Sequence, residues 1–249
     1  MRKLLAANWK MHLTLAEAER LLQATCAGLP NPNPVPVVLC VPAPYLTVAA
    51  RFAKATGEVY VGGQNLSAHA QGAYTGEVSG AMLRSTGADY VIVGHSERRS
   101  LFFEDNHTVR TKVERALAEG LRPILCVGET LEERTSGHWQ AVIEQQLTTA
   151  FLALPPERQR ATVVAYEPVW AIGTGQTATP AQAAEVHDYI RRLAGPIGQE
   201  LTILYGGSVK PDNAADLFAL PTLDGALVGG ASLDAEAFLA IHAALMATA

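Results

Sequence analysis

The chain alternates eight short apolar runs with longer amphipathic segments, and this alternation constrains its fold more than any other feature. The apolar runs are rich in Val, Ile and Leu and are nearly continuous, which is typical of parallel strands covered on both faces. The runs are Leu4–Trp9, Val37–Val41, Val59–Gln64, Tyr90–Gly94, Ile124–Val127, Val163–Tyr166, Thr202–Tyr205 and Gly225–Val228. Helical patterns alternate with them, for example at Leu15–Leu29, Thr108–Glu119, Gly137–Leu154, Pro180–Leu193 and Asp234–Met246.

Eight strand–helix alternations in 249 residues match the count and size of a closed (β/α)8 barrel, or TIM barrel, of the α/β class. An open, doubly wound sheet is the alternative fold, although about six strands would be more usual there. No linker or low-complexity tract divides the chain, so residues 1–249 are expected to form a single domain. In such a barrel, ligands bind where the strands end, so the active site is expected at that rim.

Composition excludes several classes of partner. The net charge is -5 and no dense Lys/Arg run occurs, so a nucleic-acid surface is not expected. The first apolar run is too short for a signal or a membrane span, and no long apolar segment follows, so we expect a cytoplasmic protein without membrane contact. Cys26, Cys40 and Cys126 lie in apolar segments without a CxxC motif, and we interpret them as reduced core thiols.

Charged side chains follow three of the predicted strands. Lys10 comes directly after the first strand, where a long cation can point into the mouth of a barrel, although a solvated surface lysine is the commoner case. His95 follows the fourth strand and precedes Ser96; if Ser96 opens a helical turn, the helix dipole favours a neutral imidazole, which can still donate to a carbonyl. A structural, hydrogen-bonded histidine is the alternative.

Glu167 ends the sixth apolar run and is followed by Pro168, which favours extended backbone, so its carboxylate should project from a strand end. A carboxylate in an apolar rim can act as a general base, more so when water is excluded. The next residues could form a hinge and a closing lid. This predicted lid comprises Pro168, Val169, Trp170, Ala171, Ile172, Gly173, Thr174 and Gly175.

Glycine-bearing turns follow the last two predicted strands, at Gly206-Gly207-Ser208 and at Gly229-Gly230. Such turns expose backbone N–H groups, and in barrels of this kind the corresponding loops often bind phosphate. The 7 histidines include no HxH or HExxH pair, so no metal site is expected. The segment Gly173–Ala178 fits G-x-G-x-x-A but does not directly follow a strand, so no dinucleotide cofactor is expected either.

Several of these motifs together resemble the triosephosphate isomerase family. The matching segments run from the first strand to the last: Ala7–Met11 (ANWKM), Val93–Glu97 (VGHSE), Ala165–Gly175 (AYEPVWAIGTG), Leu204–Ser208 (LYGGS) and Leu227–Ala231 (LVGGA). The resemblance implies a cofactor-free isomerase of glycolysis and gluconeogenesis that interconverts dihydroxyacetone phosphate and D-glyceraldehyde 3-phosphate through an enediolate. The family is itself a standard example of tuned acid–base chemistry.

The resemblance also implies a role for each site residue. Glu167 would move the proton between carbons, His95 would polarise the carbonyl as a neutral imidazole, and Lys10 would add positive charge. Asn8 would position the substrate, and Ser96 and Glu97 would support the site. The phosphate would be held by backbone N–H groups, at Gly173, Ser208, Gly229 and Gly230. Departures from the family pattern are few, at His12 and Gln176.

A long glycine-containing loop, Ser67–Ser79, resembles the segment through which members of this family form homodimers. Thr75 would reach toward the site of a second copy, and Glu77 would pair with Arg98 near the interface. A solvent-exposed loop without a partner is the alternative, although loops of this length in compact domains tend to be functional. Two other functions stay open: a barrel aldolase that uses Lys10 as a Schiff base, and a non-catalytic sugar-phosphate binder.

Overall fold

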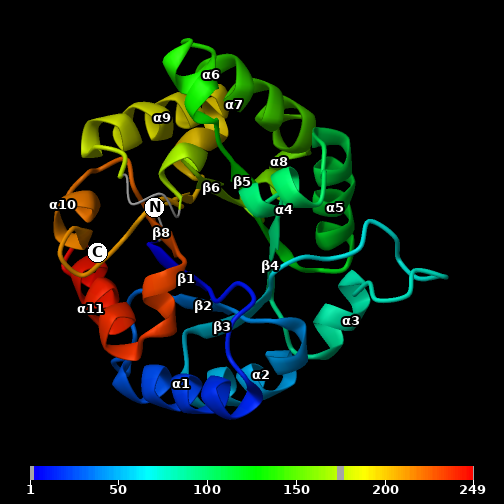
Figure 1. Ribbon diagram of the computed structural model, residues 1–249, viewed down its shortest axis with the longest axis vertical. Helices are drawn as coiled ribbons and strands as arrows, with labels where there is room; N and C mark the ends of the chain where they lie inside the picture. The colour runs from blue at the N-terminus through cyan, green and yellow to red at the C-terminus, as the bar shows by residue number, and fades with distance from the viewer. Residues whose placement is uncertain (1–2, 173–176, 249) are drawn as a thin grey trace.

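A computed structural model describes residues 3–172 and 177–248, which form a closed barrel of parallel strands in the order β1 to β8 (Figure 1). The strands are β1 Leu4–Asn8, β2 Val37–Cys40, β3 Val59–Gly63, β4 Tyr90–Val93, β5 Arg122–Val127, β6 Val163–Tyr166, β7 Ile203–Tyr205 and β8 Gly225–Val228. Closure is direct, because β1 pairs with β2 on one side and with β8 on the other. The barrel prediction is therefore confirmed, and the open sheet is excluded.

Helices surround the barrel (Figure 1). The α-helices are α1 Leu15–Gly28, α2 Leu46–Thr56, α3 Gly80–Ser85, α4 Ser96–Leu101, α5 Asn106–Ala118, α6 Leu131–Thr135, α7 Trp139–Leu147, α8 Pro156–Arg160, α9 Pro180–Leu193, α10 Ala214–Phe218 and α11 Ala235–Met246. Shorter turns are the 3-10 segments η1 Ala43–Tyr45, η3 Val169–Ala171, η4 Gly195–Gln199 and η5 Gly230–Leu233, and the π-helical segment η2 Thr148–Leu152.

Local sequence signals explain where the longer helices begin and end. Helix α9 starts at Pro180, whose fixed φ suits a first turn, and the Thr179 side chain caps it by accepting from the N–H of Gln182. Helix α5 is followed by Gly120, which adopts φ 72, a conformation that glycine reaches without steric cost. The predicted helix Gly137–Leu154 is shorter than expected, because α7 passes into the wider π-helical turn η2 after Leu147.

Two apolar layers divide the side chains of each strand between them. Leu4 and Ala6 of β1 point into the barrel, where they pack with residues such as Val38, whereas Leu5 and Ala7 pack outward against the helices. This alternation is the period of two that every strand imposes. The same alternation decides which residues face the open end of the barrel. A residue at the end of a strand faces inward there when it lies two residues beyond a member of the inner layer.

All three cysteines are buried and unpaired with one another, as expected for core thiols. Cys40 and Cys126 belong to the inner layer of the barrel, and burial raises the pKa of both thiols. Among the described residues, no helix is long and apolar enough to cross a membrane.

Candidate active site

Strand parity places Glu167 at the mouth of the barrel. Val163 and Ala165 of β6 belong to the inner layer, and Glu167 is the next residue in phase with them. Its backbone N–H still bonds the carbonyl of Val127, at 2.8 Å, so the carboxylate is set by the sheet. The residue is only 2% exposed, and room for it comes from Gly206, where an added Cβ would lie 2.8 Å from the Glu167 Cγ.

The Glu167 carboxylate is held by the turn that follows β4. Its Oε2 accepts a hydrogen bond from the backbone N–H of Ser96 at 2.9 Å, and its Oε1 lies 2.9 Å from His95 Nε2. Burial raises the pKa of Glu167, but the charge and hydrogen bond of His95 and the Ser96 N–H lower it by more, so the pKa falls below its usual value. The group is therefore an ionised carboxylate at neutral pH.

His95 caps helix α4 rather than simply preceding it. Its Nδ1 accepts a hydrogen bond from the backbone N–H of Glu97 at 3.2 Å, so in a neutral ring the proton sits on Nε2, facing Glu167. Burial lowers the pKa of His95, but the negative charge of Glu167 outweighs it, and the pKa is raised. The helix start, which favours a neutral ring, is therefore not the only influence on His95, because the nearby carboxylate favours the charged form.

Lys10 occupies a left-handed backbone conformation, with φ 52, which is unusual for a residue with a Cβ. Three contacts hold it there: its N–H donates to Asn8 Oδ1 at 3.0 Å, its carbonyl accepts from Gln64 Nε2 at 2.9 Å, and its Nζ lies 2.6 Å from Glu97 Oε1. Backbone strain that the surroundings enforce in this way is concentrated at functional sites in proteins. Glu97 Oε2 also lies 3.6 Å from His95 Nδ1, so the Glu97 carboxylate is close to two of the predicted catalytic residues, Lys10 and His95.

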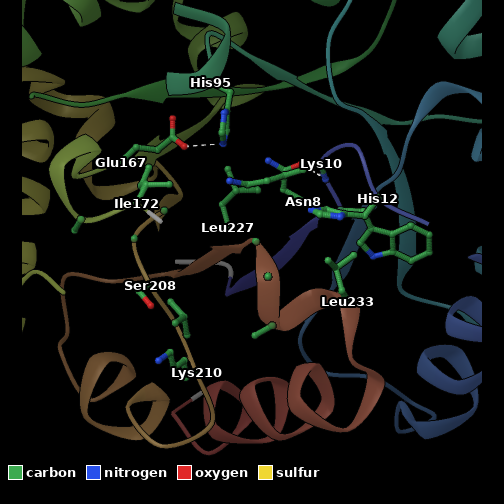
Figure 2. A pocket seen from close by; sticks show the side chains of 18 residues that line it. Asn8, Lys10, His12, His95, Glu167, Ile172, Ser208, Lys210, Leu227 and Leu233 are labelled. Carbon is green, nitrogen blue, oxygen red and sulfur yellow. Dashed lines mark hydrogen bonds and ion pairs between the residues drawn. The ribbon is translucent and has the colours of Figure 1, made fainter. Parts of the chain in front are cut away.

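These groups line one cavity of about 380 Å³ (Figure 2). Around it lie side chains from β1, β4 and β6 together with both glycine-bearing loops. The predicted catalytic and substrate-binding residues that line it are Asn8, Lys10, His95, Glu167, Ser208, Gly229 and Gly230. Gly230 opens η5, and the first N–H groups of a helical turn have no partner within that turn. The structure thus brings together a carboxylate, an imidazole, an ammonium and two glycine-bearing loops.

The predicted lid is described only in part. Pro168 leads into η3, and the Trp170 ring N–H donates to Glu129 Oε1 at 3.0 Å. The predicted lid and phosphate residue Gly173, together with Thr174 and Gly175, lies outside the described residues, as does Gln176. Ala171 and Ile172 line the cavity, so the near end of the segment reaches the site.

Sequence reasoning missed several residues of this site. Glu129 is fully buried at the end of β5 and also accepts from Tyr166 OH at 2.9 Å; the rule that strand ends carry chemistry would have found it. Lys210 and Leu227 line the cavity, and Gln64 braces Lys10. Within residues 3–172 and 177–248, the side chains of His, Cys, Asp and Glu form no group of three or more that could hold a metal ion.

The residues predicted for an interface do not line this cavity. Thr75 and Glu77 are exposed on the Ser67–Ser79 loop, which projects away from the barrel between β3 and α3 (Figure 1). Arg98 forms an ion pair within the chain with Glu104, and its guanidinium lies 4.4 Å from the centre of the Phe102 ring. Glu77 and Arg98 both line a second cavity, beside the exposed Met11 and Leu101.

Comparisons with known proteins agree on one family. The family model described as triosephosphate isomerase matches residues 3–245. A curated relative named triosephosphate isomerase from Nitrosomonas eutropha is 50% identical over 240 residues, which is 95% of each chain. Another with this name, from Herminiimonas arsenicoxydans, is 50% identical over 244 residues, or 96% of this chain and 98% of the relative. The crystal structure of triosephosphate isomerase from Bartonella henselae superposes with a TM-score of 0.88 at 39% identity, covering 99% of this chain and 100% of that one.

Proposed function

This chain belongs to the triosephosphate isomerase family, and we propose that the cavity described above carries out the family's reaction with Glu167, His95 and Lys10 as its catalytic residues. The protein is an isomerase that interconverts dihydroxyacetone phosphate and D-glyceraldehyde 3-phosphate, a step of glycolysis and gluconeogenesis. One observation supports the residue assignment above all others. An ionised, buried carboxylate lies 2.9 Å from an imidazole nitrogen, in a cavity that also holds a lysine and two glycine-bearing loops.

Glu167 is the base that moves the proton. It is buried, its pKa is lowered, and it borders the cavity, so an ionised carboxylate faces the substrate carbon at neutral pH. It removes a proton from one carbon of the substrate and returns it to the neighbouring carbon, which needs no cofactor. The same group acts first as base and then as acid, because the proton stays on the carboxyl between the two steps.

His95 polarises the substrate carbonyl. Its Nδ1 is engaged by the Glu97 N–H, so Nε2 presents the proton to whatever oxygen faces it. A carbonyl oxygen that takes the place of Glu167 at Nε2 breaks the hydrogen bond through which the carboxylate helps to raise the pKa of the ring. Neutral imidazole is then the form that donates to the developing enediolate.

Lys10 and the loops stabilise negative charge. The Lys10 ammonium lies at the rim, with Asn8 fixing its backbone, and donors prearranged around developing charge contribute strongly to rate. The phosphate is bound by backbone N–H groups of Ser208, Gly229 and Gly230, with Gly173 as a further donor. Among the described residues, a Cβ added at Gly229 would meet only Lys10 Cε, at 3.4 Å, and one added at Gly230 would meet no atom within 4 Å, so the space beside both glycines is open to a ligand.

We propose a homodimer formed through the Ser67–Ser79 loop. The loop is prearranged by a stack of the His69 and Tyr74 rings, whose centroids are 4.0 Å apart. The second cavity is bordered by Met11, which is 94% exposed and has the character of an interface anchor. In this arrangement Thr75 approaches the site of the second copy and Glu77 pairs with Arg98. Sedimentation of the purified protein tests the proposal, and a monomer at micromolar concentration would refute it.

The cytoplasm is the proposed location, supported by three buried free thiols, which are more typical of proteins in a reducing compartment. The chain acts on small triose phosphates, and no nucleic-acid or membrane partner is proposed.

The decisive experiment is a coupled assay on D-glyceraldehyde 3-phosphate with no metal or nucleotide added to the isomerase. We expect Glu167→Gln to lower kcat by at least about 10²-fold, the contribution of one positioned base, with a small change in KM. The matched control is Glu157→Gln, at an exposed position of α8, which should keep normal turnover. Normal turnover of Glu167→Gln would refute the base assignment, and a borohydride-trapped adduct would favour an aldolase.

A further inference from the structure

Lys210 is a cation of the cavity to which neither the sequence motifs nor the reaction assigns a role. It follows β7 on the loop that carries Ser208, and both side chains line the cavity. In Figure 2 these two residues lie on one side of the cavity, across from Asn8 and Lys10. The two lysines that line the site therefore approach it from different strands of the barrel.

Asn213 fixes the backbone from which Lys210 extends. Its Oδ1 accepts a hydrogen bond from the Lys210 N–H at 2.8 Å, and its Nδ2 donates to the Ser208 carbonyl at 3.1 Å. One carboxamide thus spans the loop and uses both of its polar atoms. The Lys210 side chain itself is exposed, so its ammonium is free to follow a ligand while its Cα stays in place.

The charges around the cavity show that a second lysine can add positive charge that is not already neutralised. The Lys10 ammonium is 2.6 Å from Glu97, so part of its field is already neutralised. In the described part of the chain, Lys210 makes no ion pair, and the acid nearest to it in sequence, Asp212, is exposed and does not line the cavity. The chain as a whole has a net charge of -5, which repels an incoming phosphodianion.

We propose that Lys210 is a substrate-recognition residue, whose ammonium attracts the phosphodianion to the cavity and favours dianionic over uncharged substrates. The proposal rests on the proposed function, because it takes a triose phosphate as the ligand. An exposed ammonium attracts the phosphodianion through solvent, so it raises the rate of substrate capture. This attraction weakens as the salt concentration rises, because salt screens the charges. The proton transfer itself, which Glu167 performs deep in the cavity, is unaffected.

The test compares Lys210→Gln with Lys210→Arg and with Lys54→Gln, a control that removes the same charge from an exposed position on α2. At low ionic strength we expect Lys210→Gln to lower kcat/KM for D-glyceraldehyde 3-phosphate about threefold to tenfold. The loss should shrink to less than about twofold near 0.5 M salt, where the screening length is only a few ångströms. Saturated kcat and the slow turnover of unphosphorylated glyceraldehyde should not change.

Two further measurements separate charge from loop structure. Inorganic phosphate, used as an inhibitor, should bind Lys210→Gln more weakly by a similar factor at low salt. Lys210→Arg, which keeps the charge, should restore both kcat/KM and its salt dependence, whereas Lys54→Gln should behave as the wild type. A Lys210→Gln enzyme with unchanged kcat/KM and phosphate inhibition at low salt would overturn the proposal, as would a loss that arginine cannot rescue. The wild type measured in parallel keeps the two proposals distinct. An inactive wild type would count against the proposed function, whereas an active wild type with an unaffected Lys210→Gln variant would count only against the role of Lys210.

Discussion

Gly206 and Glu167 share a space that has no room for another methyl group. An added Cβ at Gly206 would lie 2.8 Å from Glu167 Cγ and 3.0 Å from the carbonyl oxygen of Tyr166. That carbonyl cannot retreat, because it accepts the Gly206 N–H at 2.7 Å as part of the sheet edge. In Gly206→Ala the side chain of Glu167, the proposed base, is therefore the group that must move.

The expected displacement follows from ordinary carbon contacts. Such contacts lie at about 3.5–4.0 Å, so the Glu167 side chain must shift by about 0.7–1.2 Å. In the wild type, the Glu167 carboxylate lies 2.9 Å from His95 Nε2 and 2.9 Å from the backbone N of Ser96. A shift of this size would break or misdirect both contacts. A misplacement near 1 Å costs about 10²-fold in rate, so kcat should fall by about that factor. Overpacking should also lower the free energy of unfolding by about 1–3 kcal/mol.

The assay is steady-state kinetics with D-glyceraldehyde 3-phosphate, together with thermal unfolding to show that the variant is folded. The control is Gly28→Ala, where the added Cβ meets Leu239 Cδ1 at 2.2 Å, at the end of α1. This change crowds a flexible side chain outside the cavity, so stability can change while kcat stays within about twofold. A folded Gly206→Ala enzyme with wild-type kcat would refute the inference that Gly206 sets the position of Glu167, the proposed base.

Two further predictions concern stability. Arg191→Met leaves Asp224 buried without its ion-pair partner, so we expect a loss of about 3–5 kcal/mol in urea unfolding; an unchanged midpoint would contradict this. Burial lowers the pKa of His187 to about 3, whereas in the unfolded chain the pKa is near 6.5. Between these two values the unfolded chain binds one proton more than the folded chain, so the free energy of unfolding falls as the pH drops from about 6.5 toward 3. His187→Phe should reduce this slope by up to about 1.4 kcal/mol per pH unit, and an identical slope in the variant would exclude His187 as the cause.

The strand-end residues illustrate how far the sequence could lead. Lys10, His95 and Glu167 each follow an apolar run, and the barrel rule places all three at one rim without any knowledge of their contacts. The period of two within β6 even determines that Glu167 is in phase with the inner layer. These inferences depend on local order alone, since apolar runs and proline or glycine signals act over a few residues.

Contacts between residues far apart in the chain could not be inferred from the sequence. Lys10 pairs with Glu97 across 87 positions, and Ser96 bonds Glu167 across 71. The charge preference of His95 could not be decided until the carboxylate was seen beside it. Lys210 was overlooked for the same reason, because it stands in no motif whose meaning is visible without its spatial neighbours, whereas Glu129 could have been found from its place just after β5.

The sequence by itself determined the number of strands, the faces they bury and the rim where polar groups collect, because hydrophobic periodicity depends only on residues close together in the sequence. Only the tertiary structure decided which of those polar groups touch, how far apart their atoms lie and which charges are neutralised. The physical reason is that closure of the barrel fixes the register between β1 and β8, and with it every distance across the mouth.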